Sequence, residues 1–148
     1  MKQRLTIIDF VEKYTAEYAD HVFLREKVDN VWTETTYRET REQAHVIGAG
    51  LMALGMQKGE RAALLSQGRN LWVTGELGIL YAGGVNVPLS IKLEEANDLL
   101  FRIQHSDAQY IMTSEQQLPK IRKILPECPN VKYVIVFDTL PEYQDREI

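Results

Sequence analysis

The residues of this 148-residue sequence that could do acid–base, nucleophilic or metal chemistry are few and widely spaced. His21, His45 and His105 lack the close spacing of metal ligands, such as H-x-x-x-H. Cys128 follows Pro126-Glu127, and no histidine or aspartate at a suggestive spacing would activate its thiol. We interpret His45 as a surface or satisfied histidine and Cys128 as a loop thiol. The pattern assigns no catalytic, cofactor-binding or metal-binding residue.

Two glycine patterns resemble nucleotide-binding strings. Residues Gly48 to Ala53 match G-x-G-x-x-A, but the string falls in the middle of an expected helix, where no free helix N-terminus can face a pyrophosphate. We interpret it as helix packing. Gly55 to Gly59 is followed by Glu60, so it lacks the lysine and hydroxyl of a phosphate loop. We interpret it as a turn.

Ser66-Gln67-Gly68-Arg69 follows an expected strand and precedes an expected helix. Ligands of open α/β sheets bind beyond the carboxyl ends of strands, so these residues could form part of a pocket wall. The alternative is a plain loop with Ser66 near a helix cap. A cluster of acidic residues at Glu94, Glu95 and Asp98 is read as a solvated helix face.

The element around which the chain is organised is the stretch Leu77 to Ser90, LGILYAGGVNVPLS. It predicts the end of a buried helix, a break at Gly83-Gly84 and a buried central strand at Val85 to Leu89. The helix, which starts at Arg69 or Asn70 and runs to Ala82, is apolar nearly all round and should be buried. Its Gly75 and Gly78, like Gly48 and Gly50, suggest close helix approach.

The N-terminal part predicts a helix and a hairpin. Thr6 can cap a helix that runs to Tyr18, and strands at 22–27 and 31–36 flank a turn at Asp29-Asn30. We expect Trp32 on the packed face of this hairpin. Thr36 to Glu39 is a capping box that opens a helix to about Leu54.

The remainder alternates between strands and helices. The expected strands are 61–66, 85–89, 110–113 and 131–137, and the expected helices between the last three are 93–106 and one after a capping box at 114–117. Such alternation predicts an α/β fold with a mostly parallel sheet and helices on both faces. We divide the chain into a helix and hairpin (1–36), βα repeats (37–137) and a polar tail (138–148), all within one segment.

Composition narrows the class of protein. The hydrophobic fraction of 45% and the charged fraction of 26% are typical of a globular protein, and the net charge of −4 disfavours a nucleic-acid partner. Asp9 and Glu12 interrupt the only stretch where a signal peptide would lie, and one cysteine allows no internal disulfide. We therefore expect a cytoplasmic protein.

Three blocks together resemble the N-terminal part of adenylate-forming acyl-coenzyme A synthetases, nearest to long-chain fatty acid–CoA ligases. They are Thr35 to Glu39, similar to the family's "(L/W)TYxEL"; Leu51 to Leu65, similar to "LxxLGxxKGDRVAIL"; and Leu77 to Ser90, similar to "LAILxAGAVxVPL". The resemblance covers residues 5–137. One departure is at 66–72, where Gly68 and Leu71 replace an Asn and a Glu of the family's "SxNRxEW", so the order of that loop is in question.

The resemblance implies an incomplete N-terminal subdomain of a longer enzyme that uses ATP, Mg²⁺ and coenzyme A to activate a fatty acid. The phosphate loop, the T-x-E segment, the ribose-binding Asp and the C-terminal Lys of such enzymes have no counterpart in this chain, which by itself should be inactive and bind no cofactor. The expected partners are the remainder of the parent enzyme and a second copy of the chain. Contact with a membrane surface stays open, as does the preferred acyl-chain length. The alternative is a stand-alone α/β module that binds a partner or a small ligand without catalysis.

Overall fold

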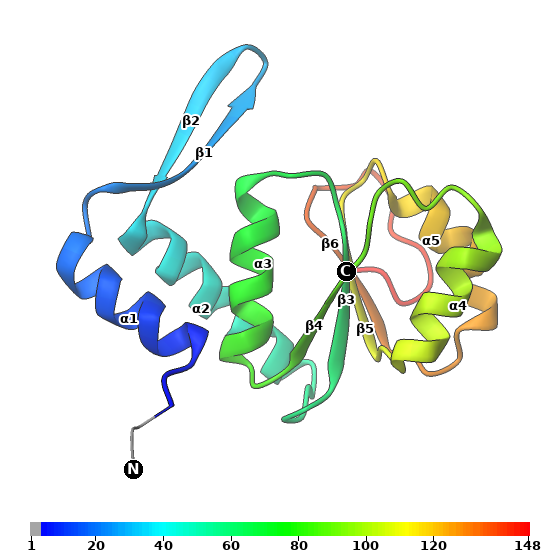
Figure 1. Ribbon diagram of the computed structural model, residues 1–148. Helices are drawn as coiled ribbons and strands as arrows, with labels where there is room; N and C mark the ends of the chain where they lie inside the picture. Colours follow the sequence, from blue (N-terminus) through cyan, green and yellow to red (C-terminus); the bar gives the residue numbers. More distant parts are fainter. Residues whose placement is uncertain (1–3) are drawn as a thin grey trace. The chain divides into compact units, whose positions relative to one another are not determined.

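The computed structural model describes residues 4–148, which fold as two compact units. The first unit contains residues 4–56 together with Arg69–Ala82, and the second contains Gln57–Gly68 and Gly83–Ile148. The division does not follow the order of the chain, because one helix between two strands of the second unit belongs to the first (Figure 1).

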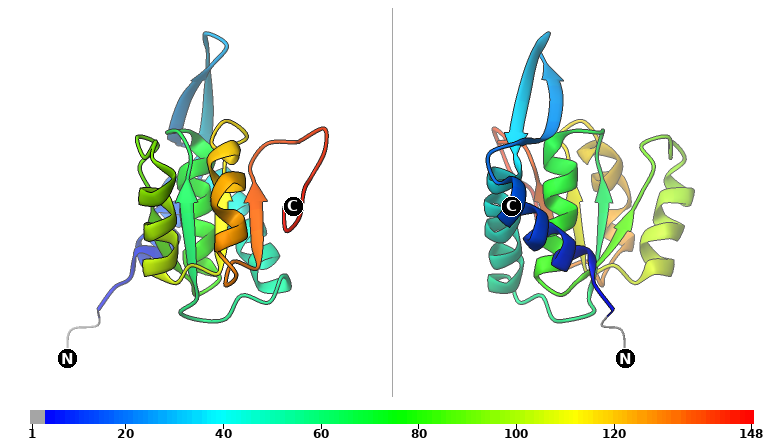
Figure 2. Two further views of the ribbon diagram at one scale, coloured as in Figure 1. Left: turned by 90° about the vertical axis from the view of Figure 1, so that its right-hand side faces the viewer. Right: turned by 60° about the vertical axis from the view of Figure 1, so that its left-hand side comes forward.

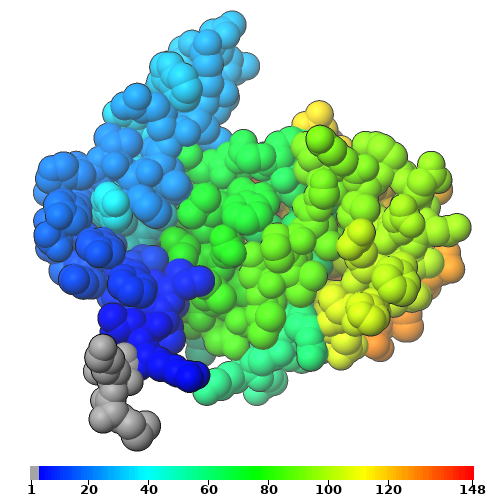
Figure 3. All heavy atoms as spheres, in the orientation of Figure 1, coloured from blue at the N-terminus to red at the C-terminus, as the bar shows by residue number. Residues whose placement is uncertain are grey.

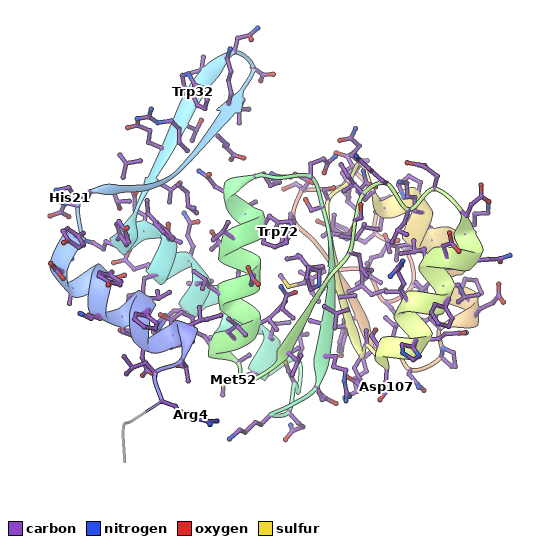
Figure 4. The ribbon with its side chains drawn as sticks, viewed as in Figure 1. Arg4, His21, Trp32, Met52, Trp72 and Asp107 are labelled. Carbon is purple, nitrogen blue, oxygen red and sulfur yellow. The ribbon has the colours of Figure 1, made fainter. Side chains whose placement is uncertain are left out.

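The first unit consists of three helices and a two-stranded antiparallel hairpin: α1 (Ile7–Tyr18), β1 (Val22–Val28), β2 (Val31–Thr36), α2 (Tyr37–Ala53) and α3 (Asn70–Tyr81). Both expected N-caps form capping boxes, Thr6 with Asp9 and Thr36 with Glu39. In the space-filling view the hairpin stands out from the helices of its unit (Figure 3). The prediction for Trp32 was wrong, because 60% of this residue is exposed on the hairpin (Figure 4).

The helices α2 and α3 approach closely at two glycines. A Cβ atom added to Gly48 would lie 3.0 Å from the carbonyl oxygen of Gly78, and one added to Gly78 would lie 2.5 Å from Cγ2 of Ile47. The packing interpretation of the G-x-G-x-x-A string is therefore confirmed at Gly48. It was wrong for Gly50, which has no heavy atom within 4 Å of the position of a Cβ.

The second unit is a four-stranded parallel sheet in the order β4-β3-β5-β6, with helices between its strands. Its elements are β3 (Arg61–Leu65), β4 (Val85–Pro88), α4 (Ala96–Ser106), β5 (Tyr110–Thr113), α5 (Leu118–Ile124), the 3-10 turn η1 (Leu125–Glu127) and β6 (Tyr133–Val136). Figure 2 shows α4 and α5 lying over the same face of the sheet. The α/β fold class with a parallel sheet, predicted from the alternation of elements, is confirmed.

The core of the second unit lies between this face of the sheet and the two helices. On the sheet side the core contains three register neighbours of adjacent strands, Ala63, Ile111 and Val134. On the helix side it contains buried residues of α4 and α5, namely Leu99, Ile103, Leu118, Ile121 and Ile124. Every residue from Ala62 to Leu65 is buried, so side chains on both faces of β3 are covered. This is the burial pattern of a parallel strand inside an α/β sheet.

Three expectations for this unit were wrong. The strand β4 is an edge strand rather than a buried central one, and Val85 is 47% exposed. The helix α4 begins at Ala96 rather than at Leu93. Ser114 forms no capping box, because α5 has no side-chain cap and the Ser114 hydroxyl bonds elsewhere.

Residues 138–148, treated as a polar tail from the sequence, carry two buried side chains, Leu140 and Glu147. Their last residues pair in parallel with β6: the N–H groups of Val134 and Val136 donate to the carbonyl oxygens of Arg146 and Ile148. The outer edge of β6 is therefore occupied. None of the helices in the described chain has the length and apolar character to cross a membrane.

Candidate functional site

The topology of the second unit defines one place where a ligand could bind. From β3 the chain passes to β4 on one side of the sheet, whereas from β5 it passes to β6 on the other side. The switch point therefore lies between β3 and β5, and ligands of open α/β sheets bind outside the carboxyl ends of strands at such a point. The residues that follow these two strands are Ser66 to Gly68 and Ser114 to Gln117.

Side chains at the switch point bond the ends of β3 and β5 together. The Ser114 hydroxyl donates to Oε1 of Gln67 at 2.6 Å, and the Thr113 hydroxyl donates to the carbonyl oxygen of Leu65 at 2.8 Å. The Ser66 hydroxyl donates to the carbonyl oxygen of Gln67 at 3.1 Å. Gln67 is thus the residue through which the two loops are held. The loop after β3 lacks the Asn and Glu of the family pattern at Gly68 and Leu71. The hydrogen bond between Gln67 and Ser114 holds its conformation instead.

Three polar, uncharged residues at the switch point are buried, whereas Glu115 is exposed. Ser66, Ser114 and Gln117 are at most 6% exposed. Oε1 of Gln117 has no hydrogen-bond partner among the described residues, and a buried polar atom of this kind costs about 1–3 kcal/mol. Hydroxyl and amide groups can position a ligand through hydrogen bonds, but without an adjacent base they cannot act as nucleophiles. The arrangement is suited to a binding wall.

The sequence located half of this site. Ser66 and Gln67 were identified because they follow an apolar strand and precede a helix. Ser66 lies in the loop before α3 but does not cap it, because the N-cap is Arg69 and no side chain caps the helix. Ser114 and Gln117 were missed as site residues. The same signal was available for them, since they follow the strand β5.

The remaining sequence candidates are placed as follows. Gly55 and Gly59 have positive φ angles of 93° and 85°, as glycines in turns do, which confirms the turn. Cys128 is buried, and burial raises the pKa of its thiol, so the reactive thiolate is disfavoured. His105 stacks on Phe101, and His21 contacts Tyr18 edge to face.

The first unit contains a cluster of ionisable groups that sequence reasoning missed. The Glu12 carboxylate of α1 accepts from Nε of Arg41 at 2.8 and 2.9 Å and from the Tyr81 hydroxyl at 2.6 Å, and it lies 3.3 Å from Nε2 of His45. The hydrogen bond from Arg41 is the main cause that lowers the pKa of Glu12 to about 2, whereas burial raises the pKa of Tyr81. A carboxylate held ionised in this way is a weak base, so the cluster is better suited to holding helices together than to proton transfer.

Magnesium would be required by the family that the sequence resembles. No group of three or more His, Cys, Asp or Glu side chains within residues 4–148 is arranged to hold a metal ion. The buried donors at the switch point are neutral hydroxyls and amides, and they include no carboxylate of the kind that usually holds Mg²⁺.

Comparison with known proteins identifies the class. Residues 11–148 match the family described as AMP-binding enzyme, and the chain belongs to this family. The match begins within α1 and includes both units. The resemblance to adenylate-forming acyl-coenzyme A synthetases is thereby confirmed at the level of the family.

Similar proteins are acid–CoA ligases of different kinds. The chain is 33% identical over 89 residues to Long-chain-fatty-acid--CoA ligase FadD15 of Mycobacterium bovis, an alignment that covers 60% of this chain and 15% of that protein. It is 28% identical over 102 residues to the human mitochondrial acyl-coenzyme A synthetase ACSM2B, covering 69% of this chain and 17% of that protein. The chain thus spans less than a fifth of the length of these relatives.

The fold also occurs in solved structures. The anthranilate CoA ligase AuaEII, solved in complex with anthranoyl-AMP, superposes with a TM-score of 0.85 at 23% identity, and the match covers 96% of this chain and 26% of that chain. At this level of identity the likeness shows the fold alone. It agrees with the parallel sheet and the N-terminal helix and hairpin described above.

Proposed function

We propose that this chain is the N-terminal part of an ATP-dependent fatty acid–coenzyme A ligase. In the proposed reaction a fatty acid carboxylate attacks the α-phosphate of ATP, which releases pyrophosphate and forms an acyl-adenylate. The thiol of coenzyme A then attacks the acyl carbon and displaces AMP. The observation that carries the proposal is the family match over residues 11–148. The FadD15 likeness supports the long-chain class of substrate, although the set of relatives also includes an acyl-coenzyme A synthetase not named for long chains.

The contribution of this chain to that reaction is positional. The switch-point residues Gln67 and Ser114 are uncharged and neither carries a base, so they would form part of a wall rather than the reacting groups. We propose that ATP, Mg²⁺ and coenzyme A are held mainly by the remainder of the enzyme, its expected partner, and that the protein acts in the cytoplasm. The isolated 148-residue chain should then neither bind ATP tightly nor catalyse the ligase reaction.

The test compares two proteins. One is the isolated 148-residue chain, and the other is the product of the longest reading frame that contains it. Pyrophosphate release and acyl-CoA formation are measured with ATP, Mg²⁺, coenzyme A and saturated fatty acids of increasing chain length. We expect turnover only in the longer protein, with long chains preferred.

The contrary outcomes separate the parts of the proposal. If the longer protein forms no acyl-CoA with any fatty acid, the proposed function is wrong. Turnover that copurifies with the isolated chain would instead refute its inactivity. If the reading frame does not extend beyond these 148 residues, the hypothesis of a stand-alone binding module is favoured instead.

A further inference from the structure

Most of the helix α1 is exposed. Of its 12 residues only Thr15 is buried, whereas Ile7 is 60% and Phe10 is 44% exposed. The Thr15 hydroxyl has no hydrogen-bond partner among residues 4–148. A groove of about 320 Å³ remains open between α1 and the segments that hold Phe23 and Tyr37. Little apolar surface therefore holds this helix in place.

The C-terminal end of α1 is fixed to the start of α2 through the backbone. The N–H of Arg38 donates to the carbonyl oxygen of Ala19 at 3.0 Å, and the N–H of Tyr37 donates to that of His21 at 3.1 Å. The ring of Tyr18 also packs on that of Tyr37, with centroids 6.2 Å apart. His21 marks this junction between α1 and β1 in Figure 4. These bonds would stay intact if the helix swung outward.

The middle of α1 is held chiefly by the Glu12 carboxylate. It is the only carboxylate of the helix that bonds to both α2, through Arg41 and His45, and α3, through Tyr81, among the described residues. Asp9, the carboxylate nearest in sequence, bonds to Thr6 within its own capping box. Hydrogen bonds to an ionised acceptor are the strong ones, so losing this one group removes most of the specific attachment.

We propose that α1 is a hinged latch, closed by the Glu12 carboxylate and pivoting at residues 19–21. Opening moves residues 7–18 away as one unit, exposes Arg41, His45 and Tyr81 together, and leaves α2 and α3 packed at Gly48 and Gly78. Protonation of Glu12 at acidic pH weakens the latch, and the groups that face this carboxylate are Arg41, His45 and Tyr81. The inference does not depend on the proposed ligase function.

Hydrogen–deuterium exchange of the 148-residue chain tests the latch. In Glu12→Gln, which keeps the size of the side chain and removes its charge, we expect exchange of peptides from residues 7–18 to rise about tenfold, while peptides from α2 and α3 stay unchanged. The matched control is Glu17→Gln, an exposed residue of the same helix whose carboxylate bonds to Tyr18 within α1. It should exchange like the wild type.

A milder variant covers the case in which Glu12→Gln does not fold. Tyr81→Phe removes one of the donors and leaves Arg41 in place, so it should raise exchange of α1 by about threefold. The latch is refuted if α1 in these variants exchanges at the wild-type rate. It is also refuted if α1, α2 and α3 accelerate equally, because that result means cooperative unfolding of the whole unit rather than hinged opening.

Discussion

At the scale of single residues, the hydrogen-bond partner of a hydroxyl at the end of a strand depends on whether a neighbouring strand ends beside it. Ser114 and Thr36 are both hydroxyl residues three positions before a Glu or Gln, at the end of a strand. Thr36 caps α2, whereas Ser114 bonds to Gln67 across the switch point. The local pattern is the same, and the presence of a neighbouring strand end decides the outcome.

Glu147 gives a residue-scale prediction. Its side chain is 1% exposed and is paired with Arg122 through bonds of 2.7 and 2.8 Å, which is the main cause that lowers the pKa of Glu147. Glu147→Gln should lower the free energy of unfolding by about 2 kcal/mol, because one charge of a half-buried pair is left without its partner. Urea unfolding measures the change. Glu115→Gln, at an exposed site, is the control and should cost under about 0.5 kcal/mol.

The pH dependence of the same pair follows from the sign of the shift. Because the pKa of Glu147 is lower in the folded than in the unfolded protein, its stabilisation is complete above the ordinary value of 4.5 and is lost as the pH falls through the folded value. The difference between wild type and Glu147→Gln should therefore shrink as the pH falls below 4.5. A difference that stays constant down to pH values near 2 would contradict this account.

At the scale of elements, helix caps and the helical periodicity of apolar residues could be predicted because both patterns are local in the sequence. The boxes at Thr6 and Thr36 involve residues three apart, so the sequence alone could suggest them, although a bond to another element can prevent such a box, as at Ser114. Close approach between helices is not local. Gly48 and Gly50 differ by two positions on α2, and only the position of α3 shows which of them faces it.

These glycines give a matched pair of predictions. Gly50→Ala should raise the free energy of unfolding by up to about 1 kcal/mol, since alanine favours helix and the added methyl group has no heavy atom within 4 Å. Gly48→Ala gains the same propensity but places Cβ 3.0 Å from the Gly78 carbonyl oxygen, so we expect a net loss of about 1 kcal/mol. Thermal and urea unfolding of both variants measure the changes. Equal effects would show that this helix contact can move apart without cost.

At the scale of the whole chain, the alternation of strands and helices predicted the fold class but not the strand order. Residues 85–89 looked like a central strand because they belong to the most apolar stretch of the sequence, Leu77 to Ser90. Among the described strands they pair with β3 alone, and Pro88, which cannot donate to a ladder, suits an edge. Only half of the candidate site was found, because the end of β3 could be recognised from the sequence but 44 residues separate this strand from its neighbour β5.

The position of β4 sharpens the expectation that the chain self-associates. The outer edge of β6 is covered by residues 146–148, whereas none of the described strands pairs with the outer edge of β4. Exposed strand edges offer backbone donors and acceptors to another molecule, and a second copy can pair there about a two-fold axis. We expect a dimer at micromolar concentration, observed as a mass near twice 17.0 kDa by light scattering coupled to size exclusion.

Val85→Lys, which adds a charge to this edge, should shift the equilibrium to the monomer, while Val46→Lys, at a 73% exposed site on α2, should leave it unchanged. A mass of 17.0 kDa across a tenfold dilution series would show that this edge stays unpaired, and equal dissociation by both variants would place the dimer contact elsewhere.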